Sequence, residues 1–235
     1  WRRQRKFAAS PFGKTTLFQP EQFQEFAATF RITVRRRIEA LRQRLASSGE
    51  RMAGIHLEPE IKVVMLEMLT NNFFGADISY EDLRDRYVPA LDRVINHIVQ
   101  DTVKNRLGIP WRKLPRVTRR IAQARDDDAA FDELTDLVLK PRSEKKALWR
   151  QFKSEAPDEK LLSNLKVFLA GALEATTSYS TWAISHLARN TSAQELVFQD
   201  VKNIDEYTPE TLATAKYLRY ALDETLRLTP SLYFL

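Results

Sequence analysis

Large apolar side chains recur along most of the chain with the spacing of one helix face. Between Pro20 and Leu45 they fall on a single stripe, made of Phe23, Phe26, Phe30, Val34, Ile38, Leu41 and Leu45. Pro20 suits the first turn of a helix, and Glu21 complements the positive amino end of the helix dipole. The pattern therefore predicts a long amphipathic helix over residues 20–45, followed by a loop over 47–54.

The same periodicity predicts further helices at 59–75, 79–103, 129–140, 144–155, 158–189, 191–203 and 208–228. Ser79 and Asp82 have a spacing that resembles a capping box, and Pro89 should kink the helix or mark its beginning. The segment 108–120 interrupts the pattern, and Pro230 prevents the last helix from continuing. Strand signals are almost absent and no internal repeat is found, so the predicted fold class is an all-α segment.

Composition narrows the class of protein. The 235 residues suffice for one substantial domain or two small ones, and the 43% hydrophobic content is that of a chain that buries a core. The net charge of +6 fits either a mixed, solvated surface or a basic face for an acidic partner protein. Nucleic acid is not an expected partner, because the arginine clusters lack interleaved aromatic residues. Cysteine is absent, so this chain supplies no disulfide, thiolate nucleophile or Cys ligand to a metal.

Targeting and membrane signals are also missing from the sequence. The longest apolar run, at 167–173, is too short to span a bilayer, and no leader is visible at the amino end. We expect a cytoplasmic protein if its source is bacterial and a membrane-associated one if its source is eukaryotic.

The stretch "AGALEATTS", at 170–178, places poor helix formers inside a predicted helix. Serine and threonine hydroxyls bond back to carbonyls of the preceding turn and loosen the helix, and Glu174 needs a polar or wet neighbour. Glu174 with Thr176 and Thr177 is one candidate proton-delivery station. The alternative is a helix whose polar face happens to be rich in threonine.

Two further pairs have helical spacing. Trp1 and Arg5 lie four residues apart, and an indole N–H and a guanidinium together can bind one carboxylate; the alternative is an exposed basic helix start. Glu224 and Arg227 lie three apart and can form an ion pair, although most such pairs are solvated surface contacts.

Other catalytic motifs are absent. The three histidines have no metal-ligand spacing and are interpreted as surface or cap residues, and no GxSxG, P-loop or GxGxxG pattern occurs.

The order of these signals resembles that of the cytochrome P450 family. "WRRQRKFAASPF" resembles the family's WxxxR helix, "FLAGALEATTSYSTW" its oxygen-activation motif, and "YLRYALDETLRLTPSLYF" its K helix with ExxR. "LRLTPS" is closest to the mitochondrial-type branch. The resemblance covers essentially residues 1–235, as one partial domain that runs from the C helix to just past the K helix. It implies a mainly-α fold whose β-sheets and haem-binding Cys loop lie mostly outside this chain.

The resemblance also implies residue roles. Trp1 and Arg5 would bind a propionate of haem b, and the region of Gly171, Ala172 and Ala175 would cross the distal face of that cofactor. Glu174, Thr176 and Thr177 would be the catalytic residues. Glu224 and Arg227 would form a buried structural charge network. The substrate pocket would receive Ser231, Leu232 and Phe234.

Two features depart from the family pattern. The iron of the family is held by a Cys thiolate beyond the K helix, and this chain has no Cys, so no metal ligand is expected within it. Trp182 stands eight residues after Glu174, which makes Glu174 the family's acid and puts Ala175 where the usual Thr stands. If Ala170–Gly171 is the anchor instead, one extra residue remains, as in a helix bulge.

The implied activity is that of an oxidoreductase acting on paired donors with incorporation of O₂ (EC 1.14 type). It would hydroxylate a lipophilic organic substrate with electrons from a ferredoxin or reductase. Alternatives are a peroxygenase or isomerase that does not rely on the usual Thr, and a catalytically dead helical binding protein derived from the family. We expect the isolated chain to have poor stability, because helices that wrap a cofactor expose apolar faces without it.

Overall fold

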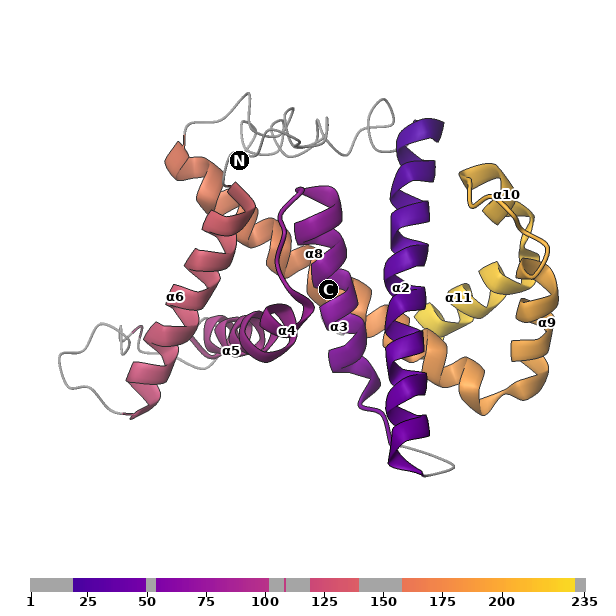
Figure 1. The fold of residues 1–235 in the computed structure, drawn as a ribbon, viewed down its shortest axis with the longest axis horizontal. Coiled ribbons are helices and arrows are strands. Elements are labelled where there is room, and N and C mark those ends of the chain that lie inside the picture. Colours follow the sequence, from indigo (N-terminus) through magenta and orange to yellow (C-terminus); the bar gives the residue numbers. More distant parts are fainter. Residues whose placement is uncertain (1–18, 50–53, 102–107, 109–118, 140–157, 231–235) are drawn as a thin grey trace.

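The computed structural model describes residues 19–49, 54–101, 108, 119–139 and 158–230, and within them the regular structure is entirely helical (Figure 1). This confirms the predicted all-α segment. The helices are α2 (Pro20–Ser48), α3 (Leu57–Glu67), η1 (Met68–Phe73), α4 (Tyr80–Asp82), η2 (Leu83–Tyr87), α5 (Val88–Val99), α6 (Arg119–Leu139), α8 (Asp158–Arg189), α9 (Thr191–Val201), α10 (Pro209–Thr214) and α11 (Lys216–Leu228), of which η1 and η2 are π-helical. The helix predicted at 144–155 lies outside the described residues.

Local sequence sets several of these boundaries as predicted. Helix α2 has proline in its first turn and ends at Gly49, whose φ of 69° is a left-handed conformation that glycine adopts without strain. Pro89 stands in the first turn of α5, directly after the π-helical turn η2. Because proline cannot donate to the preceding turn, the change of helix type falls at this position. Ser79 caps α4 by accepting a hydrogen bond from the Asp82 backbone N–H at 3.0 Å.

Two predicted boundaries were wrong. Helix α6 begins at Arg119 rather than at residue 129, because the polar run 125–128 is helical and Asp127 is buried against Arg93 of α5. The single helix predicted at 208–228 is two helices, α10 and α11, separated by Ala215 at φ −78° and ψ 79°. The Asp200 carboxylate of α9 accepts hydrogen bonds from the backbone N–H groups of Tyr217 and Leu218 at the start of α11. A long-range cap therefore favours a new helix start at this point.

The core forms where α3, α5, α6 and α8 meet. Fully buried leucines join these helices, with Leu66 on α3, Leu91 on α5, Leu134 on α6 and Leu169 on α8. Aromatic rings extend the same cluster, since Phe168 of α8 lies 6.1 Å from Phe73 and 5.9 Å from Phe74, measured between ring centroids. Burial of such large side chains is the main stabilising contribution to the packing of α8.

Helix α8 is the longest helix described and crosses the molecule. In Figure 1 it runs, in orange, from beside α6, behind α3 and α2, to α9. It contacts α3 and α6, among others through Glu174 and Lys166, and further along the chain it contacts α9 and α11. The fold therefore holds the centre of α8, with the stretch 170–178, at the junction of the two groups of helices.

Candidate functional site on helix α8

Helix α8 has one buried face. Leu165, Leu169, Leu173 and Thr177 are all fully or almost fully buried, and they follow one another at intervals of four residues. That interval places side chains on one side of a helix, here the side that packs on α3. The orientation of α8 is thus fixed by its leucines.

The opposite face of α8 carries small or exposed side chains. Val167 is 74% exposed, Gly171 is exposed and Ala175 is half-buried, again at intervals of four residues. A Cβ atom built on Gly171 would meet no atom within 4 Å among the described residues. We call Val167, Gly171 and Ala175 the small-residue stripe. Most apolar residues at the centre of a helix this long are covered, so the stripe is the part of α8 most available to a large apolar ligand.

The two candidate threonines behave differently. The Thr176 hydroxyl donates back to the carbonyl of Ala172 and lies 3.2 Å from the carbonyl of Leu173. Thr177 is 1% exposed, and its hydroxyl has no hydrogen-bond partner among the described residues. A buried hydroxyl without a partner is uncommon and costs free energy unless water or a ligand group satisfies it. The structure thus makes Thr177 the hydroxyl that is free to bond elsewhere, and Thr176 the one that is already used.

Glu174 lies beside the stripe in a cluster of charges. Its Oε1 atom is 3.1 Å from Nζ of Lys62 on α3, and the same Nζ donates to Oδ1 of Asp92 on α5 at 2.7 Å. Glu58 lies at the rim, with Oε1 3.7 Å from Nζ. Burial alone lowers the pKa of Lys62, but the hydrogen bonds and charges of Asp92 and then of Glu174 outweigh it and raise the pKa above its usual value. Lys62 is therefore a buried ammonium that stays protonated.

The sequence analysis missed Lys62 and Asp92. They come from α3 and α5: Lys62 contacts Glu174 and Asp92 contacts Lys62, so only the packing of α3 against α8 and α5 forms the cluster. One local signal existed, because Lys62 interrupts an apolar run of the helix predicted at 59–75. A lysine in that position needs carboxylate partners, although the sequence does not say which ones.

The predicted pair of Glu224 and Arg227 forms on α11. Nε and Nη2 of Arg227 donate to the two carboxylate oxygens at 2.8 and 2.6 Å, and this guanidinium lowers the pKa of Glu224. The predicted burial is not tested by this part of the protein and stays a prediction; within the described residues, the two side chains are 53% and 67% exposed. The reason is that α11 packs on α8 and α9 through its other side, so no described residue covers the pair.

Several predicted site residues lie outside the described ranges. These are Trp1, Arg5, Ser231, Leu232 and Phe234. Ala172, which was assigned to the cofactor face, is half-buried and accepts the Thr176 hydrogen bond. Within the described part of the chain, no group of three or more His, Cys, Asp or Glu side chains could hold a metal ion. No helix in that part has the length and apolar content to cross a bilayer.

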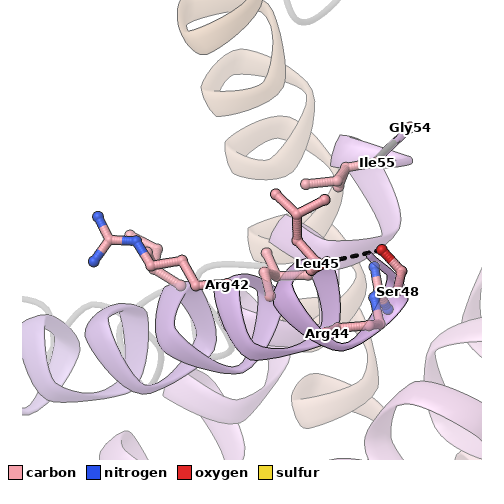
Figure 2. A pocket seen from close by; sticks show the side chains of 8 residues that line it. Arg42, Arg44, Leu45, Ser48, Gly54 and Ile55 are labelled. Atoms are coloured by element: carbon pink, nitrogen blue, oxygen red, sulfur yellow. Dashed lines mark hydrogen bonds between the residues drawn. The ribbon is translucent and has the colours of Figure 1, made fainter. Parts of the chain in front are cut away.

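A separate hollow lies at the carboxyl end of α2. Figure 2 shows Leu45 and Ile55 directed into it and Arg42, Arg44 and Ser48 at its edges, and its volume is about 500 Å³. It contains none of the candidate residues of α8. The only hydrogen bond drawn there joins the Ser48 hydroxyl to the carbonyl of Leu45, at 2.8 Å, which is a helix-end contact.

Comparison with curated proteins gives several partial matches. The chain is 28% identical over 109 residues to cytochrome P450 71B1 of Thlaspi arvense, which covers 45% of this chain and 21% of that protein. It is 39% identical over 67 residues to the mitochondrial 1,25-dihydroxyvitamin D(3) 24-hydroxylase of Rattus norvegicus, covering 27% and 13%. It is 20% identical over 181 residues to the trifunctional (S)-stylopine, (S)-nandinine and (S)-canadine synthase of Argemone mexicana, covering 72% and 35%. Only one of these three relatives is described as mitochondrial, so the predicted mitochondrial-type branch is not confirmed.

The fold comparison agrees with the sequence comparison. The crystal structure of a cytochrome P450 (CYP102L1) superposes with a TM-score of 0.68 at 19% identity, over 97% of this chain and 53% of that one. The chain thus spans about half the length of the solved structure and smaller fractions of the curated relatives. The family model described as Cytochrome P450 matches residues 1–235. The chain belongs to the cytochrome P450 family.

Proposed function

We propose that this chain is part of a haem-dependent monooxygenase that hydroxylates a lipophilic organic substrate, and that it forms a single domain with the rest of that protein. The observation that carries the proposal is the small-residue stripe of α8, which is open and lies beside Glu174. Family membership supports a monooxygenase with a haem cofactor. We assign haem b as that cofactor.

The stripe fits a planar macrocycle. Val167, Gly171 and Ala175 present no long side chain. The space over Gly171 is open, so no side chain there would keep the haem ring away from α8. An exposed valine on this helix also gains from being covered, at about 25 cal/mol per Å² of apolar area. The donors present here include no thiolate, so a Cys ligand of the haem iron would come from outside these residues. Trp1 and Arg5 would bind a propionate.

When bound, the haem supplies O₂ activation and the oxidation of an unactivated C–H bond. The residues of this chain supply orientation and protons. Glu174 borders the stripe and is partly exposed, so its carboxylate can take up a proton from water and release it on the cofactor side. The unpartnered hydroxyl of buried Thr177, three residues further on, can hold a water molecule in line with Glu174.

Thr176 has a supporting role in this proposal. Its back-bond to Ala172 occupies its hydroxyl within the helix, so it loosens the helix rather than delivering a proton. Ser178 is three residues beyond Ala175 and therefore near the same face, where the sequence analysis had not placed a hydroxyl. The substrate would meet Ser231, Leu232 and Phe234, and Glu224 and Arg227 would be covered by other parts of the protein.

The electron donor would be a ferredoxin or a reductase. The net charge of +6 is compatible with an acidic partner, and the same charge does not separate the two classes of donor. The donor that supports turnover of the full-length protein distinguishes the two classes.

A second candidate function is supported by one observation. Ala175 stands where the family has its usual Thr, and Thr176, the next residue, has its hydroxyl bonded within the helix. A protein that uses peroxide or rearranges its substrate does not need this proton delivery. The second candidate is therefore a peroxygenase or isomerase of the same fold.

The two candidates separate in one experiment on the full-length protein that carries this chain. Product is measured from a panel of lipophilic substrates with NADPH and a ferredoxin or reductase system, and in parallel with hydrogen peroxide alone. The monooxygenase proposal predicts NADPH-dependent product and a large loss in Glu174→Gln, about 100-fold for a residue that delivers protons. Turnover with peroxide alone, unaffected by Glu174→Gln, would instead establish the second candidate.

A further inference from the structure

Lys62 is the most deeply buried cation among the described residues that has more than one carboxylate partner. Its side chain is 5% exposed, whereas those of Asp92 and Glu174 are 39% and 41% exposed. The three residues come from three helices, α3, α5 and α8. The ammonium therefore depends on its partners for stabilisation, while each carboxylate can also reach water.

The two main contacts of Lys62 are unequal. Nζ makes a 2.7 Å hydrogen bond to Asp92, but Oε1 of Glu174, at 3.1 Å, has no well-aligned hydrogen bond with any described residue. The contact with Glu174 is therefore the longer and less well aligned of the two, and it is the weaker one. If the Glu174 side chain turned away, Asp92 would still accept a hydrogen bond from the buried ammonium of Lys62. The movement would therefore leave no buried charge without a partner.

The other charges nearby are already paired. Glu58 is at the rim of the cluster, on the same helix as Lys62, and lies 3.7 Å from Nζ. Arg93, next to Asp92, donates through Nε and Nη2 to buried Asp127 at 2.8 to 3.0 Å. Lys166, two turns before Glu174 on α8, pairs with Asp132 of α6. Lys62 is thus the cation that contacts Glu174 in the described part of the chain.

We propose that Lys62 is a positioning residue for Glu174, and that Asp92 sets how firmly it holds that carboxylate. Paired with Lys62, Glu174 is drawn toward α3 and away from the small-residue stripe. Released from Lys62, it can turn toward the stripe and deliver a proton taken from water. This inference rests on the proposed function, because it assigns Glu174 the role of proton carrier.

The proposal makes a prediction that a purely structural role does not. Asp92→Asn removes the competing negative charge, so Lys62 should hold Glu174 more firmly and proton delivery should slow. Lys62→Met replaces the ammonium that holds Glu174 with an apolar side chain of similar length. The carboxylates of Asp92 and Glu174 remain hydrated because they are partly exposed. If Lys62 only stabilised the fold, both variants would impair the protein in the same direction.

The experiment uses the full-length haem-loaded protein and has two parts. The first is a double-mutant cycle in urea unfolding between Lys62→Met and Glu174→Gln, which needs no turnover. The second measures, for Lys62→Met and Asp92→Asn, the solvent deuterium isotope effect on product formation and the peroxide released per NADPH oxidised. Lys166→Met is the matched control, since it removes a lysine with a cross-helix carboxylate partner near, but not at, Glu174. Lys62→Arg tests rescue by a cation of the same charge.

The proposal predicts a coupling of about fivefold or more in the unfolding constant between Lys62 and Glu174. It also predicts that the isotope effect and the peroxide fraction both rise in Asp92→Asn and both fall in Lys62→Met. In Lys62→Arg the two quantities should return toward their wild-type values, and in Lys166→Met they should not change. Coupling below about twofold, or parallel changes in Asp92→Asn and Lys62→Met, would overturn it. A folded wild-type protein that takes up no haem when haem is supplied would defeat the proposed function instead, and the unfolding cycle would still show whether Lys62 holds Glu174.

Discussion

Replacement of Gly171 by leucine should have opposite effects on the helix and on cofactor binding. Glycine inside a helix is about 1 kcal/mol less favourable than alanine, and leucine is only slightly less favourable than alanine. A Cβ on Gly171 meets no described atom, so the new side chain causes no clash within the described chain. Without haem, Gly171→Leu should therefore raise the free energy of unfolding by about 0.8 kcal/mol, roughly a fourfold change in the unfolding constant.

With haem, the same substitution should be harmful. A leucine on the small-residue stripe would occupy the space that we assign to the macrocycle, and overpacking of this kind typically costs 1 to 3 kcal/mol. Haem affinity should fall by about 5- to 150-fold. Gly171→Ala should show the helix gain with a smaller loss of haem, and Ala188→Leu, at an exposed position near the end of α8, should leave haem binding unchanged.

The assays are urea unfolding of the haem-free full-length protein and transfer of haem from each holoprotein to excess apomyoglobin, followed by Soret absorbance. The reasoning would be refuted if Gly171→Leu retained haem as well as the wild type. Gly171 would then not face the cofactor, and α8 would be rotated relative to our assignment.

Three further predictions concern the fold. Leu169→Ala, at a fully buried position, should lower the free energy of unfolding by about 3 to 5 kcal/mol in urea titrations, and a loss below about 1 kcal/mol would contradict the core position of α8. Asp200→Ala should cost about 1 kcal/mol and speed amide exchange at the start of α11, because the long-range cap is lost; unchanged exchange there would count against the cap. Burial raises the pKa of Tyr80 to about 12, with Arg37 opposing and Glu60 adding to that rise. Because the folded-state pKa of Tyr80 is raised, its contribution to stability is complete below about pH 10 and is lost as the pH rises through 12. Tyr80→Phe should remove one late step from the phenolate absorbance titration of the folded protein. A titration that Tyr80→Phe leaves unchanged would disprove the shift.

The sequence predicted the parts of the fold that depend on local pattern. The stripe of α2, the proline at the start of α5 and the length of α8 all follow from residues within one helix. The same holds for the Glu224–Arg227 pair, since its spacing of three residues brings the side chains together on any helix.

The parts that the sequence did not predict depend on contacts between distant segments. The polar run before residue 129 was expected to be a loop, but Arg93 of α5 neutralises Asp127 and makes burial of that helix turn possible. The break at Ala215 depends on Asp200, which is in another helix. Helical pattern alone carries no information on such partners.

The candidate site shows the same division. Glu174 and its hydroxyl neighbours could be found on one helix, but their roles could not be separated from sequence alone. Thr176 and Thr177 are equivalent in the sequence, and only packing shows that one hydroxyl bonds within the helix and the other is buried without a partner. Lys62 enters the site from a helix that begins more than 100 residues earlier in the chain.

The most direct test of the account is the haem content of the purified full-length protein, with its reduced carbon monoxide difference spectrum. The account predicts one haem per chain, bound over the small-residue stripe and held by a thiolate supplied from outside the residues described here, with the red-shifted Soret band of that ligation. If Gly171→Leu abolished the haem spectrum while the protein stayed folded, this loss would place the haem against α8. A folded protein that takes up no haem when haem is supplied would contradict the account.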